Sequence, residues 1–253
     1  MKNKILNITS ILAALLLVTN CFAQSKNNKM KKKILFVVTS HDTKGSTGEK
    51  TGYYMGEVSH PWEVLTKAGY EIDFVSPKGG NPPVDGFDLT DETNKLFWED
   101  AYYHNKISNS MKPSEVNPKT YEAIYFAGGH GAMWDLADNQ EIAKIAAKIN
   151  EKNGVIAAVC HGSAGLANIT LKDSSYLVSG KKVNGFTNEE EEIVNLTNIV
   201  PFLLEDKLKE RGGIFEKSAP WQNHVTVDGR LITGQNPQSA KAVGEAMVKV
   251  LAK

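Results

Sequence analysis

The chain has 253 residues, of which 41% are hydrophobic and 23% are charged, and its 29 basic residues balance 29 acidic ones. This composition is ordinary for a globular protein long enough to bury a core, and it excludes a disordered or collagen-like chain. Two cysteines cannot form a disulfide framework, and the absence of a basic excess argues against a nucleic-acid binder.

The charges are unevenly distributed along the chain. Residues 1–23 contain two lysines and no acid, and residues 24–33 contain five lysines and no acid. From Ile34 onward, 22 basic residues stand against all 29 acidic ones, which gives a net charge of −7. We therefore expect a basic, disordered lead-in at 24–33 and a mildly acidic folded body, a single domain, over 34–253.

The first 23 residues have the pattern of a secretory signal peptide. Lys2 and Lys4 precede an apolar run at 11–18, and this eight-residue run is shorter than the roughly 20 residues that span a bilayer. The sequence around Cys21 then fits cleavage after position 23. We expect an exported protein, periplasmic or secreted, without stable membrane insertion; a lipid anchor on Cys21 is the alternative interpretation.

Strand and helix patterns alternate through the folded body. The first strand pattern is a continuous apolar run, typical of a buried parallel strand, and it is followed by a loop at 41–56 rich in Gly, Ser, Thr and Lys. The expected strands are residues 33–40, 70–76, 121–128, 154–159, 224–227 and 231–233, with a further ordered segment at 176–183. The expected helices are residues 58–68, 140–153, 162–169, 200–211 and 237–251.

Residues 81–118 interrupt this alternation. They contain four prolines and a group of aromatic residues, which together predict an insertion with short helices that covers another part of the molecule. Outside the insertion, strands that alternate with helices imply βαβ units and a mostly parallel sheet with right-handed crossovers. Because ligands bind beyond the carboxyl ends of such strands, the residues that follow each strand are the candidates for function.

Cys160 follows the predicted strand at 154–159 and is followed directly by His161. A nucleophile on a tight strand-to-helix turn is the arrangement of many α/β enzymes, and the strained turn requires the small residues that surround this cysteine. A helix N-terminus at this point also predicts a thiol pKa below its free value of ~8.5. We interpret Cys160 as a nucleophile rather than as a buried structural cysteine.

Gly128, Gly129 and His130 follow the predicted strand at 121–128. Two glycines let the backbone approach a ligand closely, and their N–H groups can stabilise an oxyanion. The same residues also fit an ordinary turn with an uninvolved histidine. Glu57 opens the first predicted helix, where an acid commonly interacts with the helix dipole.

The sequence offers no convincing metal or nucleotide motif. The acidic run at 189–192 fits a solvated surface, and its spacing selects none of the four glutamates. No P-loop or dinucleotide fingerprint follows the first strand, so we expect neither a metal nor a cofactor. Four scattered residues would have to be gathered by folding to bind a metal: His41, Asp42, Glu57 and His60.

Five segments, in order along the chain, resemble the class I glutamine-amidotransferase-like superfamily, which includes the Parkinson-disease protein deglycase and archaeal intracellular proteases. Within it the chain is most similar to the glutathione-independent glyoxalases, also called glyoxalase III and described as heat-shock chaperones. The resemblance runs from about residue 33 to the C-terminus. The segments are residues 57–61 (EVSHP), 127–131 (AGGHG), 157–162 (AAVCHG), 185–192 (GFTNEEEE) and 229–240 (GRLITGQNPQSA).

The resemblance implies a flavodoxin-like α/β sandwich with helices on both faces of the sheet and a set of catalytic roles. Cys160 would be the nucleophile and His161 its triad histidine. Glu191 would orient His161, with Glu190 as the alternative if the register shifts by one residue. Glu57 would lie against the Cys160 sulfur and shuttle protons.

The resemblance also implies a substrate and a reaction. Backbone N–H groups of Gly129 and His161 would hold the oxyanion, next to Gly128 and His130. Methylglyoxal and water would become lactate through a Cys160 hemithioacetal, without glutathione. The partner would be a small aldehyde substrate, and the family habit suggests a homodimer.

Two other functions stay open at this stage. One is a cysteine amidase or peptidase that uses the same site, because an adjacent Cys-His pair permits acyl transfer. The other is a holdase chaperone or stress protein without catalysis, of which a thiol-oxidation sensor is a variant. A holdase needs an exposed apolar patch, and the candidates for it are Phe97, Trp98, Tyr102 and Tyr103.

Overall fold

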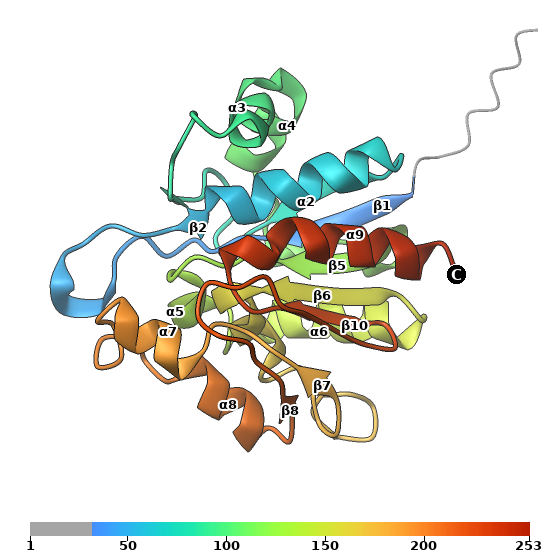
Figure 1. The fold of residues 1–253 in the computed structure, drawn as a ribbon. Helices are drawn as coiled ribbons and strands as arrows, with labels where there is room; N and C mark the ends of the chain where they lie inside the picture. The colour runs from blue at the N-terminus through green and yellow to red at the C-terminus, as the bar shows by residue number, and fades with distance from the viewer. Residues whose placement is uncertain (1–31) are drawn as a thin grey trace, which may run out of the picture. The chain divides into compact units, whose positions relative to one another are not determined.

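Six strands form the central sheet of residues 32–253, the part of the chain that the computed structural model describes (Figure 1). Their order across the sheet is β3-β1-β5-β6-β10-β9, and all neighbours are parallel except β10 and β9. The strands are β1 (Lys33–Val37), β3 (Glu71–Val75), β5 (Tyr121–Phe126), β6 (Val155–Val159), β9 (Val225–Asp228) and β10 (Leu231–Gly234). The predicted α/β class with a mostly parallel sheet is confirmed.

The central strands are apolar on both faces because helices cover both. Every residue of β6 is buried, as are four of the five residues of β1. The register sets Phe36 of β1 between Phe74 of β3 and Tyr125 of β5, and its ring packs against both, with centroid separations of 5.7 and 4.7 Å. Since β5 and β6 are adjacent and parallel, the segments that follow them lie side by side.

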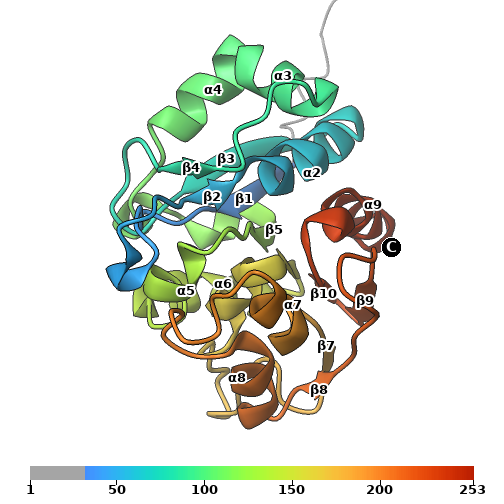
Figure 2. The same ribbon diagram turned by 60° about the vertical axis from the view of Figure 1, so that its left-hand side comes forward.

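Helices α2 (Met55–Lys67) and α9 (Ala240–Leu251) pack against each other on one face of the sheet, and α6 (Gln140–Glu151) covers the other face (Figures 1 and 2). The helix expected at 140–153 is observed as α6, and its buried face contains Ile142, Ile145 and Ile149. Helices α2 and α9 approach closely at Gly244, where a Cβ atom would lie 3.0 Å from Pro61 Cα.

The remaining elements are short. Their bounds are β2 (Tyr53–Tyr54), β4 (Val84–Asp85), α3 (Glu92–Glu99), α4 (Ala101–Ser108), α5 (Ala132–Asp135), β7 (Lys182–Val183), α7 (Asn188–Ile193), α8 (Leu204–Glu210) and β8 (Ile214–Phe215). The segment expected at 176–183 is a strand only over β7, and the helix expected at 162–169 is a 3-10 helix, Cys160–Leu166. Helix α7, which forms from the acidic run, was not anticipated.

The insertion at 81–118 covers α2 and β3. Phe97 of α3 is fully buried, with its ring 5.2 Å from Trp62 of α2, and Lys106 of α4 forms a 2.6 Å ion pair with Asp73 of β3. Of the four aromatic candidates for a holdase patch, Phe97 is buried and only Tyr102 is largely exposed, at 55%.

The predictions for the leader concern residues 1–31, including Cys21, which lie outside the described residues. Of the expected lead-in at 24–33, Lys32 and Lys33 are described, and Lys33 is already the first residue of β1. None of the helices that the structure describes is both long and apolar enough to cross a membrane.

Candidate active site

Cys160 lies on a sharp turn between β6 and the 3-10 helix that follows it. Its φ of +54° is in the left-handed region, which costs free energy for any residue with a side chain. The turn fits beneath β5 only because its neighbours are glycines: a Cβ atom on Gly162 would lie 2.3 Å from Phe126 O, and one on Gly165 would lie 2.5 Å from the Phe126 ring. The sulfur is thereby presented at the carboxyl end of the strand, although the residue is only 3% exposed.

His161 connects Cys160 to Glu191. The Cys160 Sγ lies 3.3 Å from His161 Nδ1, and His161 Nε2 lies 2.8 Å from Glu191 Oε2. Burial raises the pKa of Glu191, but the neighbouring His161 and His130 outweigh burial and lower this pKa to about 2. An ionised Glu191 accepts the His161 Nε2–H, which leaves Nδ1 facing the sulfur. The three residues therefore have the geometry of a catalytic triad.

Glu190, the alternative triad acid, faces away from His161. Its carboxylate accepts hydrogen bonds from Thr187 N, Trp221 N, Gln235 Nε2 and Asn236 Nδ2 at 2.8–3.1 Å. With the side chain of Thr187 it forms the capping box that begins α7. This cap fixes the start of the helix, so the next residue, Glu191, projects toward the histidines.

Glu57 lies in the first turn of α2 and is completely buried. Its Oε2 accepts a 2.7 Å hydrogen bond from Gly128 N, and its own carbonyl accepts one from Tyr125 Oη at 2.6 Å. Burial raises the pKa of Glu57 to about 8, against the opposing hydrogen bonds from Cys160 and Gly128. The predicted neighbour of the cysteine is thus in place, and its free oxygen Oε1 has no nitrogen or oxygen partner among residues 32–253.

The prediction of a lowered thiol pKa is wrong for the free protein. Burial and the negative charge of Glu57 raise the pKa of the Cys160 thiol well above its ordinary value, although the backbone N–H of His161 opposes this by donating to the sulfur. Burying two adjacent negative charges is costly. At neutral pH both groups therefore keep their protons, and they titrate as a coupled pair.

The glycine turn after β5 serves two purposes. Gly128 N–H already donates to Glu57, so it is not available as an oxyanion donor. Gly129 has a φ of +97°, and a Cβ atom there would lie 2.2 Å from Gly52 O, so this position requires glycine. The Gly129 N–H donates to no acceptor among residues 32–253, so it is free to donate to a ligand.

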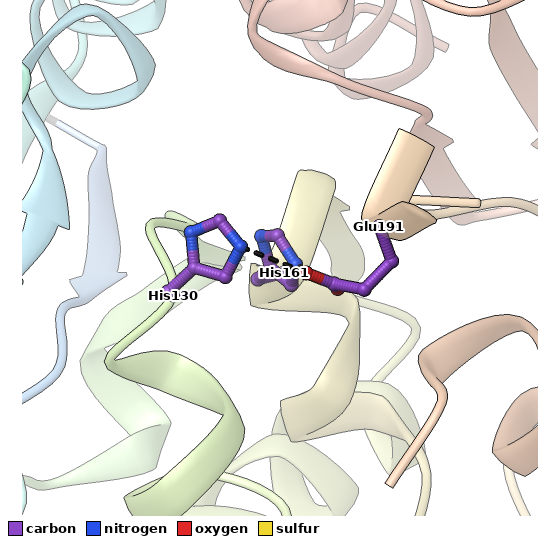
Figure 3. A group of neighbouring side chains, drawn as sticks. All are labelled: His130, His161 and Glu191. Atoms are coloured by element: carbon purple, nitrogen blue, oxygen red, sulfur yellow. Dashed lines mark hydrogen bonds and ion pairs between the residues drawn. The ribbon is translucent and has the colours of Figure 1, made fainter. Parts of the chain in front are cut away.

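His130, which follows the turn, contacts the triad. Its Nε2 lies 2.9 Å from Glu191 Oε1, and its ring lies 4.0 Å from the His161 ring between centroids. Burial, assisted by the neighbouring His161, lowers the pKa of His130 to about 4, so the imidazole is neutral at physiological pH. Figure 3 shows both histidines on one side of Glu191.

A cavity of about 290 Å³ opens onto these groups. Its lining includes Glu57, Gly129, His130, Cys160 and His161 together with Lys44, Tyr54, Asp85, Phe186, Val194, Trp221, Pro237 and Gln238. The insertion at 81–118 contributes only Asp85 to this lining. A larger, open hollow of about 560 Å³ over α7 contains none of the reactive groups.

Trp221 also lines the cavity, a role that the sequence analysis did not predict. Its φ is +61°, unusual for a large side chain, and the conformation is held by the 2.9 Å hydrogen bond from its N–H to Glu190. The ring packs 5.6 Å from Phe186. No local pattern marks this residue, because the contact that fixes it lies 31 positions away.

The four scattered candidates for metal binding are not gathered into one cluster. His41 stacks on Trp134, with ring centroids 5.0 Å apart, whereas His60 lies 3.0 Å from Asp91. Asp42 pairs with Lys50 at 2.7 Å. Glu57 lies apart from all three, buried beside Cys160.

Comparisons with known proteins bear on the whole fold. A model of the DJ-1/PfpI family matches residues 50–250. The chain is 34% identical to Glyoxalase 3 of Candida albicans, with 85% of this chain and 97% of the relative covered. It is 33% identical to the glutathione-independent glyoxalase HSP31 of Saccharomyces cerevisiae, with coverages of 87% and 98%. The X-ray structure of the 24 kDa Rapid Encystment Protein of Francisella tularensis is 42% identical and superposes with a TM-score of 0.84 over 87% of this chain and 99% of that one.

The comparisons correct the prediction of export. The relatives that match are yeast glyoxalases, and nothing in the comparisons indicates a signal peptide or export. The physical reason for the error is that two lysines before an eight-residue apolar run form a short pattern of charge and hydropathy, with no chemistry specific to secretion.

Proposed function

The chain belongs to the DJ-1/PfpI family, and from this membership we propose that it is a glutathione-independent glyoxalase that converts methylglyoxal-type 2-oxoaldehydes into 2-hydroxy acids. The observation that carries the proposal is the position of Cys160, 3.3 Å from His161 on one side and beside the buried Glu57 carboxyl on the other. A simple acyl-transfer triad accounts for His161 and Glu191, whereas an isomerisation also needs the second proton carrier that Glu57 provides.

In the first step His161 Nδ1, 3.3 Å from the sulfur, accepts the proton of the Cys160 thiol, and Glu57 supplies a second proton. When the thiolate adds to the aldehyde carbon, a carbon–sulfur bond forms and the carbonyl π-electrons move onto oxygen. Glu57 transfers its proton to this oxygen, which gives a neutral hemithioacetal and leaves Glu57 as a carboxylate. The Gly129 N–H is the free backbone donor that holds the oxygen while it is negative.

The second step moves a hydrogen within the adduct. The Glu57 carboxylate removes the proton from the former aldehyde carbon, and an enediol forms as the imidazolium of His161 protonates the neighbouring carbonyl oxygen. Glu57 then gives its proton to that neighbouring carbon and takes the hydroxyl proton from the sulfur-bearing carbon, which leaves a thioester of the 2-hydroxy acid and a protonated Glu57. The oxidation of one carbon is balanced by reduction of the other, so the sequence is redox-neutral and glutathione does not enter it.

Hydrolysis completes the cycle. His161, oriented by Glu191, takes a proton from water as the water attacks the thioester carbon, and returns it to the departing sulfur. Methylglyoxal and one water thus become lactate, and Cys160 is regenerated. The test of the proposal is formation of lactate from methylglyoxal in buffer free of glutathione, with chromogenic amides as the assay for the amidase alternative.

We also propose that the enzyme is a homodimer. The support for this is the resemblance of the sequence to a branch in which dimers are common. Sedimentation equilibrium of the purified protein tests it: a mass of two chains is expected, and a mass of one chain at micromolar concentration contradicts it.

A further inference from the structure

Two histidines and one carboxylate converge in the active site. Glu191 contacts His130 Nε2 through Oε1 at 2.9 Å and His161 Nε2 through Oε2 at 2.8 Å (Figure 3). One ligand atom from each of these side chains lies within 4.8 Å of the other two. Sequence spacing could not indicate the cluster, because 61 residues separate His130 from Glu191.

We propose that His130, His161 and Glu191, the His2Glu cluster, form a binding site for a divalent transition metal of the zinc type that competes with catalysis. Two imidazole nitrogens and a carboxylate are a common ligand set for zinc, with the fourth position left to water or another ligand. The same nitrogen-rich set also suits cobalt and nickel and disfavours magnesium and calcium, which prefer oxygen ligands.

The ligand atoms are nearly in place. Zinc lies 2.0–2.2 Å from nitrogen and oxygen ligands, so two atoms that bind the same ion lie about 3 Å apart. The hydrogen bonds already hold each imidazole nitrogen 2.8–2.9 Å from a carboxylate oxygen of Glu191. Both Nε2 atoms thus face the same carboxylate, one at each oxygen.

The surroundings of the cluster favour binding of a cation. Each imidazole would carry its proton on Nδ1 instead of Nε2 when the metal is bound, so no net proton needs to leave. His161 Nδ1 would then donate to the Cys160 sulfur 3.3 Å away, which supplies the outer hydrogen bond that metal-binding histidines usually make. His130 and His161 both line the cavity of about 290 Å³, which gives an ion a path to the site.

Metal binding would have a consequence for activity. An ion on the His2Glu cluster moves the His161 proton to Nδ1, which then has no lone pair to accept a proton, and it neutralises the charge of Glu191, so hydrolysis of the thioester stops. This inhibition rests on the proposed function, whereas the binding itself does not. A chelator would reverse the inhibition, since no covalent bond to the protein changes.

The test uses the full chain, freed of metal, with Co²⁺ as a spectroscopic probe and Zn²⁺ in calorimetry. The wild type and Cys160→Ser are each expected to bind one equivalent, with visible absorption typical of four-coordinate Co²⁺. His130→Asn is expected to weaken binding by roughly 100-fold or more, because loss of even an outer partner of a ligand costs 10–100-fold. His60→Asn is the matched control, since it removes a histidine that pairs with Asp91 instead, and its affinity is expected to equal that of the wild type.

Several results would overturn the proposal. Unchanged affinity in His130→Asn would do so, as would loss of binding in Cys160→Ser, which would place the ion on the sulfur. If His130→Asn fails to fold by circular dichroism, Glu191→Gln decides instead, and unchanged affinity there is equally fatal. Zn²⁺ binding that leaves lactate formation unchanged would refute the inhibition. Metal binding by a protein that never forms lactate would refute the proposed function but would support the metal site.

Discussion

His161 and Glu191 form a 2.8 Å hydrogen bond between two side chains that are 1% and 2% exposed. This bond fixes the orientation of the imidazole ring. Because His161 donates its Nε2–H to Glu191, its Nδ1 faces Cys160. Isolation from solvent also makes the contact electrostatically stronger than it would be in water. The alignment of the proposed triad therefore depends on where α7 begins, which the capping box at Thr187 and Glu190 determines.

Substitutions of Glu191 and Glu190 are expected to differ in effect: the first should reduce catalysis and the second should reduce stability. Glu191→Gln is expected to lower kcat by about 10²–10⁴, since loss of the carboxylate that orients a catalytic histidine costs up to about 10⁴, with little change in the melting temperature. Glu190→Gln places an amide NH₂ against a set of buried donors, and we expect it to destabilise the fold by about 2–4 kcal/mol. Steady-state kinetics and urea unfolding of both variants check this, and the reverse pattern would assign the triad to Glu190.

Stability should depend on pH through Glu57. Its pKa is about 8 in the folded protein against an ordinary value of 4.5, so the folded state binds more protons than the unfolded state between these values. The contribution of Glu57 to the free energy of unfolding is therefore fully present below about pH 4.5, and it decreases as the pH rises toward 8. Glu57→Gln cannot titrate, and thermal melts from pH 5 to 8 should show a flatter profile than the wild type.

The same variant should be catalytically impaired. An amide cannot donate and reclaim a proton, so Glu57→Gln is expected to lower kcat for lactate formation by about 10²–10⁴. Alkylation of Cys160 by iodoacetamide, measured across pH, is the second readout. With the negative charge of Glu57 gone, the thiol should titrate at a lower pH than in the wild type; an unchanged alkylation profile would mean that the two groups are not coupled.

The substitution Gly128→Ala tests how tightly the active site is packed. A Cβ atom there would lie 2.5 Å from Glu57 Oε2 and 2.8 Å from Val159 O, so Gly128→Ala must displace the carboxyl or the elbow. We expect a loss of about 1–3 kcal/mol in stability, typical of overpacking, with a loss of activity. Gly56→Ala is the control in the same helix as Glu57, because its nearest neighbour would be 3.6 Å away, and it should keep full activity.

The sequence was sufficient to predict the alternating strands and helices, because long apolar runs such as that of β6 and the periodic face of α6 are local signals. It also placed Cys160 at a strand end, and the parallel order of β5 and β6 brings the glycine turn beside it. The resemblance then supplied the partners of the cysteine, which no spacing could have selected from a run of four glutamates.

The remaining features depend on contacts between distant segments. Trp221 adopts its left-handed conformation because Glu190 accepts its N–H, and His130 joins the triad only through Glu191. The direction of the thiol pKa was mispredicted for the same reason, since a rule about helix ends ignores a buried carboxyl contributed by α2. Burial and charge at a site are properties of the assembled fold.

The most direct test of the account is lactate formation from methylglyoxal without glutathione, measured side by side for the wild type and Cys160→Ala. Removal of the sulfur creates little disturbance at a site lined by small residues, so the variant should stay folded by circular dichroism. We expect one lactate per methylglyoxal consumed by the wild type and no lactate above the uncatalysed background for Cys160→Ala. Equal lactate formation by the two proteins would contradict it.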